Sequence, residues 1–250
     1  MDTTSPAVTL DIDEGVACLT LNRPARRNAM DRALIDELRQ SLLQADRDDA
    51  VHAILLAGAG KGFCAGSDLK YIGALGIEDM ARFEQDTGDV GRLMGLISKP
   101  IVAAVETFAI GGGFILAACC DVVVAGRASR WSLPEVPHGW LTPWGLNALV
   151  QRVGRVRARN LCFCLETLDG AQAVAIGLAD QLADDGQAHA HALALARRLA
   201  QLPPAAVVAT KRFFAGGIMR DAEIMDVQAN LLFAENCRHA QARQTLDQYR

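Results

Sequence analysis

The sequence contains no apolar run long enough to cross a membrane. In its 250 residues, every hydrophobic stretch is broken by charge or glycine before it reaches the roughly 18 residues that a membrane-spanning helix requires. The first residues, Met1–Pro6, lack the apolar centre of a secretory signal. We therefore expect a cytoplasmic protein that has no membrane partner.

An excess of positive charge is also missing. The net charge is -4 and the sequence pI is about 5.7, which argues against nucleic acid as a partner while allowing a local basic pocket for phosphates. The seven cysteines are odd in number and form no CxxC pair, so a reducing compartment is the simplest account. The histidines form no metal-ligand spacing with the carboxylates, and we expect no metal site.

The first half of the chain is patterned as mixed α/β structure. Val8–Asp13 and Val16–Leu21 alternate apolar and polar residues around Gly15, which predicts a β-hairpin. Asp31 is placed to cap a helix over Arg32–Ala45. Apolar runs predict three buried strands, at Val51–Ala57, Ile101–Val105 and Val122–Val124, and a buried helix over Phe114–Cys120.

From about Arg155 onward strands become scarce, and this part of the chain is predicted to be mainly helical. Residues 71–98 are mixed in character and are expected to be helical from Ile77, although their side chains cannot be placed. The further helices are expected at 156–165, 171–176, 189–202, 205–214 and 221–248. No low-complexity linker separates the halves, so we expect one α/β core over residues 1–190 with a helical C-terminal region over residues 191–250.

Two glycine-containing loops each follow a predicted buried strand. The first reads AGAGKGFCAGSDLK (57–70) and the second AIGGGFILAACCD (109–121). The first has neither the spacing of a dinucleotide fingerprint nor the GxxxxGK[ST] pattern of a P-loop, which excludes both kinds of nucleotide site.

The glycines suggest a site built from backbone. They let the chain approach a ligand closely, and a helix that begins at Gly112 or Gly113 leaves its first N–H groups unpaired. One N–H from each loop could bind an oxyanion such as the oxygen of a thioester enolate. For either loop alone, glycines that merely permit a tight turn are the more common case.

Several motifs together resemble the crotonase family, also called the enoyl-CoA hydratase/isomerase family. The matches follow the family's order and cover most of the chain. They are LNRP (21–24) with NAM (28–30), FCAGSDL (63–69), IGGG (110–113) with CD (120–121), LPEV (133–136), and the element ending in IGLA (176–179). The resemblance implies a spiral of ββα units, with a C-terminal helical region that makes trimer contacts, as a homotrimer or a dimer of trimers.

The resemblance also implies residue roles in binding an acyl-CoA thioester. The N–H groups of Ser67 and Gly112 are expected to form the oxyanion hole. Coenzyme A enters as part of the substrate rather than as a separate cofactor, with its adenine end held by the first loop at Ala65, Gly66, Asp68 and Leu69. Arg26 and Arg27 lie where family members approach CoA and could contact its phosphates; a solvated basic turn is an equally good account of this pair.

Glu135 is the catalytic candidate. A carboxylate beside a polarised thioester can remove or deliver an α-proton, and burial raises its pKa toward the working range. Hydratases of the family carry a second glutamate two residues after the triple glycine, where this chain has Ile115. A single carboxylate suits double-bond migration in an enoyl-CoA, although single-carboxylate relatives also hydrate.

Three further side chains near Glu135 admit two interpretations each. His138 could orient water or replace the missing acid, or be a loop histidine without a catalytic role. Trp140 and Trp144 could narrow the acyl pocket, or simply pack.

The resemblance leaves other functions open. One alternative is a biosynthetic dehydratase, decarboxylase or hydrolase that acts on a CoA or carrier-protein thioester. Another is a CoA-binding or assembly subunit that has lost activity. The motive for this alternative is Ile115, which stands where hydratases carry a second glutamate. Fatty acid metabolism is the expected setting of the leading hypothesis, an enzyme that hydrates or isomerises an enoyl-CoA.

Overall fold

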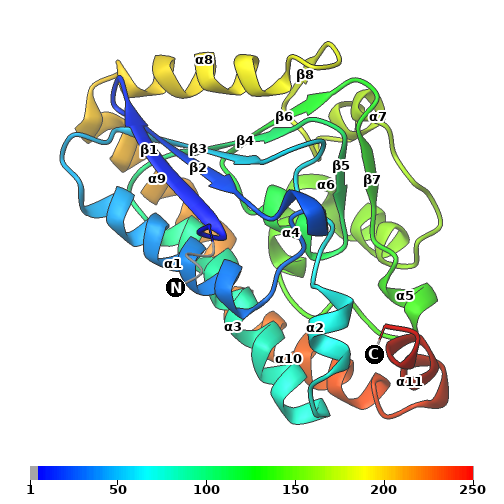
Figure 1. The fold of residues 1–250 in the computed structure, drawn as a ribbon. Coiled ribbons are helices and arrows are strands. Elements are labelled where there is room, and N and C mark those ends of the chain that lie inside the picture. Colours follow the sequence, from blue (N-terminus) through cyan, green and yellow to red (C-terminus); the bar gives the residue numbers. More distant parts are fainter. Residues whose placement is uncertain (1–4, 250) are drawn as a thin grey trace.

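A six-stranded sheet forms the centre of the computed structural model, which describes residues 5–249 (Figure 1). Its strands run in the order β1-β2-β3-β4-β6-β8. Their bounds are β1 Val8–Asp13, β2 Val16–Leu21, β3 Ala53–Gly58, β4 Ile101–Val105, β6 Val122–Gly126 and β8 Gln181–Ala183. A smaller parallel sheet pairs β5 (Phe108–Ile110) with β7 (Arg130–Ser132).

The predicted hairpin is confirmed in its strands and register. β1 and β2 pair antiparallel from Val8 opposite Leu21 to Asp13 opposite Val16. The two turn residues both have positive φ, 47° at Glu14 and 78° at Gly15, as a tight turn that matches strand twist requires. All other strand pairs of the large sheet are parallel, so the carboxyl ends of β2, β3, β4, β6 and β8 lie along one edge.

Helices cover both faces of the sheet, which accounts for the nearly continuous apolar strands. On one face lies α8 (Ala188–Ala200) (Figure 1). Its buried residues are Ala188, Ala192 and Ala196, spaced one turn apart, so the helix can lie close to the alanines and valines of the strands. The boundary predicted at residue 190 falls within this helix and stays a prediction.

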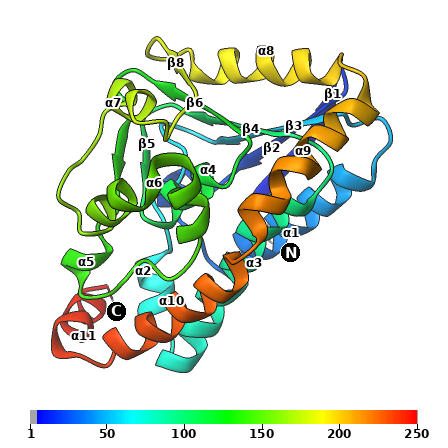
Figure 2. The same ribbon diagram turned by 180° about the vertical axis from the view of Figure 1, so that it is seen from behind.

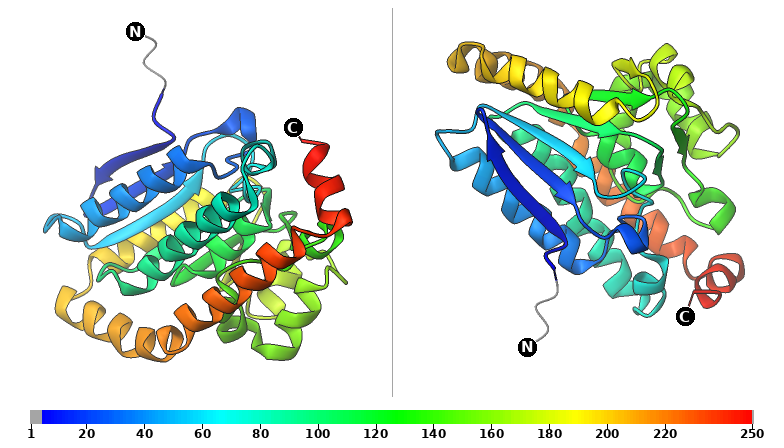
Figure 3. Two further views of the ribbon diagram at one scale, coloured as in Figure 1. Left: turned by 90° about the horizontal axis from the view of Figure 1, so that it is seen from below. Right: turned by 45° about the horizontal axis from the view of Figure 1, so that its top comes forward.

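The opposite face is covered by longer helices. α1 (Arg32–Arg47) and α3 (Ile77–Leu96) lie side by side there. α9 (Pro204–Met219) and α10 (Ala222–Asn236) follow one another end to end, and α3 lies between α1 and these C-terminal helices (Figures 2 and 3). α1 begins as predicted, because Oδ1 of Asp31 accepts a hydrogen bond from the N–H of Leu34 at 3.0 Å. The remaining helices are α2 (Leu69–Gly73), α4 (Gly112–Ala118), α5 (Glu135–His138), α6 (Leu146–Cys162), α7 (Gly170–Ala175) and α11 (Ala240–Asp247), with a 3-10 turn, η1, at Pro24–Arg26.

Three helix predictions are wrong in their bounds. The helix expected at 205–214 continues to Met219. The helix expected at 156–165 begins at Leu146 and ends at Cys162, with a break at Gly154, whose φ of 76° is not helical. The single helix expected at 221–248 is two helices, because the chain turns over residues 237–239 and α11 then packs against α2 and α5. The side-chain amide oxygen of Asn236 accepts from the N–H of Leu141 at 3.1 Å and holds this turn beside the loop after α5.

The glycines of the second loop are required by close packing against the first. A Cβ at Gly113 would overlap the carbonyl group of Cys64. Gly111 has a φ of 57°, and a Cβ there would meet the carboxylate of Glu135.

We predict that Gly113→Ala destabilises the protein by several kcal/mol, because the added methyl group would have to displace backbone rather than a flexible side chain. Gly76→Ala is the matched control, since Gly76 has no atom within 4 Å of an added Cβ. Denaturant unfolding of both variants measures the difference. Equal stability of the two variants would contradict the tight contact between the loops.

Candidate active site

The two glycine loops meet at the carboxyl edge of the central sheet. The first follows β3 directly, and the second follows β4 through the short strand β5. The loops are joined by backbone hydrogen bonds, from the N–H of Phe63 to the oxygen of Phe108 and from the N–H of Ile110 to the oxygen of Cys64, both at 3.0 Å. Crevices at the carboxyl ends of parallel strands are the usual ligand sites of α/β sheets.

A buried asparagine fixes the first loop. Asn28 is 1% exposed and has a left-handed φ of 54°, which asparagine tolerates better than most residues. Its side-chain NH₂ group donates to the carbonyl oxygens of Ala59, Gly62 and Phe63 at 2.9–3.0 Å, and its oxygen accepts from the N–H of Arg23 at 2.9 Å. These bonds join the LNRP–NAM segment to the loop that follows β3.

Within residues 5–249, the N–H groups of Ser67 and Gly112 have no backbone hydrogen-bond partner. Met30 donates to the oxygen of Gly66 and accepts from the N–H of Asp68, both at 2.8 Å, so the N–H of the intervening Ser67 points away from Met30. Gly112 is the first residue of α4, and its N–H lies outside the helical ladder. The loops touch here, because a Cβ on Gly66 would lie 3.1 Å from the nitrogen of Gly112.

Glu135 faces the same place from the first turn of α5. Its side chain is buried, with the residue 7% exposed, and Oε2 has no hydrogen-bond partner among the described residues. A buried carboxylate oxygen without a partner is costly and calls for an explanation. The catalytic candidate therefore lies in the cavity with one oxygen unused.

A second carboxylate, which the sequence analysis missed, lines the same cavity. Glu84 lies in the middle of α3 and is 2% exposed. Its Oε1 accepts from the hydroxyl of Ser67 at 2.6 Å, and its Oε2 accepts from the indole N–H of Trp144 at 3.0 Å. The signal for it was present, because Glu84 interrupts the apolar face formed by Met80, Phe83 and Val90.

Burial dominates the electrostatics of both carboxyl groups. It raises the pKa of Glu84 to about 7, against the opposing effect of the hydrogen bonds from Ser67 and Trp144. Burial likewise raises the pKa of Glu135 to about 8, and the nearby charge of Glu84 adds to the rise. Both groups therefore hold a proton more readily than an exposed carboxyl group does, and the two donors favour the ionised form on Glu84.

The cavity between these groups is small, with a volume of about 60 Å³. Trp140, Trp144 and His138 all line it, and burial lowers the pKa of His138. That volume holds a few water molecules or a thioester group. The described residues that line it are Ala65, Gly66, Ser67, Leu69, Ile72, Glu84, Gly111, Gly112, Pro134, Glu135, His138, Trp140, Thr142, Pro143 and Trp144.

Of the residues predicted to hold CoA, Ala65, Gly66 and Leu69 line the cavity, whereas Asp68 and the arginines do not. The carboxylate of Asp68 caps α2 through the N–H groups of Lys70 and Tyr71 and pairs with Arg23 at 3.2 Å, so its side chain is already occupied.

Arg26 and Arg27 are exposed on the turn beside the first loop. The carbonyl oxygen of Arg27 accepts from the N–H of Ala65 at 3.1 Å, and its guanidinium group lies 4.7 Å from the ring centre of Phe108.

Ile115, at the position where hydratases of the family carry a second glutamate, is fully buried. A Cβ at Gly145 would overlap its side chain. The position therefore serves packing between α4 and the start of α6, and it adds no polar group to the cavity.

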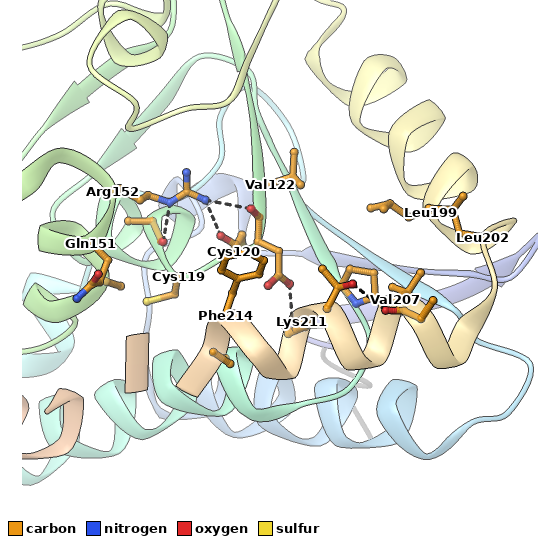
Figure 4. Close-up of a pocket in the computed structure, with 18 of the residues that line it drawn as sticks. Cys119, Cys120, Val122, Gln151, Arg152, Leu199, Leu202, Val207, Lys211 and Phe214 are labelled. Atoms are coloured by element: carbon orange, nitrogen blue, oxygen red, sulfur yellow. Dashed lines mark hydrogen bonds and ion pairs between the residues drawn. The ribbon is translucent and has the colours of Figure 1, made fainter. Parts of the chain in front are cut away.

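A larger cavity lies elsewhere, between α4, α6, α8 and α9, with a volume of about 670 Å³ (Figure 4). Its charged groups are committed to structural bonds. Lys211 donates to the oxygens of Met94 and Lys99 and to Asp121 at 2.8–2.9 Å, and Arg152 donates to the backbone oxygens of Ala118 and Cys120. Among its described lining residues, the cavity offers apolar space but no carboxyl, amino or guanidinium group without a bonded partner.

Three absences hold within residues 5–249. No helix there is both long and apolar enough to cross a membrane. No group of three or more His, Cys, Asp or Glu side chains is placed to hold a metal ion. All seven cysteines lie in this part of the chain and are free.

Comparisons with known proteins agree with this architecture. The 2,3-dehydroadipyl-CoA hydratase of Escherichia coli is 33% identical over 218 residues, covering 86% of this chain and 82% of the relative. The 1,2-epoxyphenylacetyl-CoA isomerase of the same species is 35% identical over 197 residues, covering 77% and 75% of the two chains. A crystal structure of an enoyl-CoA hydratase/isomerase from Mycobacterium paratuberculosis superposes with a TM-score of 0.90 at 25% identity, covering 98% of this chain and 99% of the other.

The profile of the enoyl-CoA hydratase/isomerase family matches residues 11–250. Together with the mixed α/β fold and these relatives, the match confirms the resemblance carried by the sequence motifs. The chain belongs to the enoyl-CoA hydratase/isomerase family of the crotonase superfamily and is an acyl-CoA enzyme of that family.

Proposed function

We propose that the protein converts an enoyl-CoA thioester through an enolate whose oxygen is bound by the N–H groups of Ser67 and Gly112. The observation that carries the proposal is the buried, unpartnered Oε2 of Glu135, which lies in the same cavity as these two free N–H groups. Glu135 carries the proton to or from the acyl α-carbon. The relatives named as a hydratase and an isomerase support proton transfer at the α-carbon of the acyl group.

Preorganised N–H donors fit this reaction because they stabilise charge that grows as the enolate forms. The thioester oxygen is nearly neutral in the substrate and becomes strongly negative when the α-carbon loses a proton. Donors fixed by the packing of Gly113 on Cys64 need no rearrangement at that moment. Glu135 contributes a carboxyl group whose raised pKa suits proton exchange with a weakly acidic carbon near neutral pH.

The CoA portion is proposed to lie along the first loop. Ala65, Gly66 and Leu69 supply backbone and apolar contact, and Asp68 contributes its backbone because its side chain caps α2. Arg26 and Arg27 are exposed next to this loop, where their guanidinium groups can reach phosphate oxygens.

The C-terminal helices are proposed to form homotrimer contacts. Phe213, Phe214, Ile224 and Leu231 are each at least 60% exposed on α9 and α10, and an apolar surface of this kind favours contact with another protein chain.

The free cysteines support a reducing location such as the cytoplasm.

Glu135→Gln is expected to lower the rate of double-bond migration from 3-butenoyl-CoA to 2-butenoyl-CoA by about 10²–10⁴-fold, because Gln cannot accept the α-proton. NMR in D₂O follows both the migration and the incorporation of deuterium. The exposed Glu223→Gln on α10 is the control and should match wild type. Wild-type turnover by the Glu135 variant would remove Glu135 from the mechanism.

The same substitution is expected to stabilise the protein at alkaline pH. Because the pKa of Glu135 is raised to about 8 in the folded protein, the unfolded chain releases this proton first, and stability falls as pH rises from about 4.5 to 8. Each pKa unit corresponds to about 1.4 kcal/mol, and Gln does not titrate. Thermal unfolding should give a Tm gap between variant and wild type that is several degrees larger at pH 8.5 than at pH 5; a gap independent of pH would mean that Glu135 is not buried.

A further inference from the structure

Glu84 is a buried carboxylate that the fold itself does not require. It belongs to no ion pair among the described residues, and no cation contributes to its pKa shift. Its partners, the hydroxyl of Ser67 and the indole N–H of Trp144, could also bond to a glutamine, with the Ser67 hydroxyl accepting instead of donating. A carboxylate at this position therefore costs desolvation energy that no ion pair with a described residue offsets.

The position of Glu84 is matched to Glu135. Both groups line one small cavity, and each lies close enough for the charge of Glu84 to raise the pKa of Glu135. They approach from different elements, α3 and α5, with the free N–H groups of Ser67 and Gly112 in the same lining. The volume of about 60 Å³ accommodates a water molecule beside a bound acyl group only if that group is thin, as a planar enoyl chain is.

Adding water across a carbon–carbon double bond requires a base at one carbon and an acid at the next. Glu135 alone supplies one of these roles, and Ile115 supplies neither. We propose that Glu84 is the base that accepts a proton from the attacking water, so that this chain hydrates 2-enoyl-CoA thioesters and catalyses the reverse dehydration. The inference rests on the proposed enolate chemistry and specifies which reaction follows from it.

The step balances with one proton on the carboxyl pair. The water oxygen forms a bond to the β-carbon while one of its protons passes to the Glu84 carboxylate. The π electrons of the double bond move to the thioester, whose enolate oxygen is held by the two N–H groups. The enolate then collapses and the α-carbon takes the proton of the Glu135 carboxylic acid. The product is a 3-hydroxyacyl-CoA, and transfer of the proton from Glu84 back to Glu135 through solvent resets the site.

Glu84→Gln tests the proposal with little risk to the fold. The amide oxygen of glutamine can accept from the Trp144 indole, and its NH₂ group can donate to the Ser67 hydroxyl, so both contacts survive. The matched control is Glu78→Gln, an exposed position in the first turn of the same helix. Thermal unfolding and tryptophan fluorescence check that both variants keep the packing around Trp144.

Two reactions are then measured on wild type, Glu84→Gln and Glu78→Gln. Hydration of 2-butenoyl-CoA is followed by the loss of enoyl absorbance, and migration of the double bond of 3-butenoyl-CoA is followed by NMR in D₂O. We expect Glu84→Gln to lose about 10²–10⁴-fold in hydration and to retain migration within a few fold, because migration needs only Glu135 and the N–H groups. Glu78→Gln should match wild type in both.

The outcomes separate this inference from the proposed function. If the wild-type protein catalyses migration of the double bond but does not hydrate 2-butenoyl-CoA, the proposed role of Glu84 is refuted and the enolate chemistry stands. Wild-type protein that does neither overturns the proposed function. Undiminished hydration by Glu84→Gln, or an equal loss of both reactions, would also refute the assignment, the latter because it would make Glu84 a positioning residue for Ser67.

Discussion

The contact between the Gly113 backbone and the carbonyl group of Cys64 is the constraint on which the site depends. It brings the loop after β3 against the start of α4 with no side chain between them. The free N–H groups of Ser67 and Gly112 consequently lie in one cavity lining, at a spacing set by backbone packing. Asn28 reinforces the arrangement by bonding to three carbonyl oxygens of the first loop, so two segments far apart in sequence share one rigid edge.

This rigidity explains how the protein can hold two buried carboxyl groups in one small cavity. Neither Glu84 nor Glu135 pairs with a cation among the described residues, and burial raises the pKa of both. Each is therefore a local loss of stability that the surrounding core must offset. The alanine-lined packing of α8 on one sheet face and of the longer helices on the other contributes to that stability. The helix α3 belongs both to this core and to the cavity, because it carries Glu84.

The sequence predicted the elements whose signals are local. The β1–β2 hairpin, the Asp31 cap and the glycine loops each depend on residues adjacent in the chain, and the structure contains all three. The three-residue strands β5, β7 and β8 were missed because so few residues carry no detectable period. Glu84 was missed for a different reason. Its importance lies in partners 17 and 60 residues away, Ser67 and Trp144, which only the folded chain brings together.

Ile115 shows why a missing motif residue is weak evidence for a missing function. The sequence favoured a single-carboxylate site because a glutamate was absent from α4. In the structure, Ile115 packs against Gly145 at the entry to α6, while a carboxylate from α3 lines the cavity. A helix that crosses beneath a cavity offers several positions from which a side chain can enter it, and a functional group is defined by where its atoms lie. The chemistry of this site is therefore better inferred from the groups that share the cavity, two carboxyl groups and two N–H groups. The sequence position from which the second carboxyl group comes is a weaker guide.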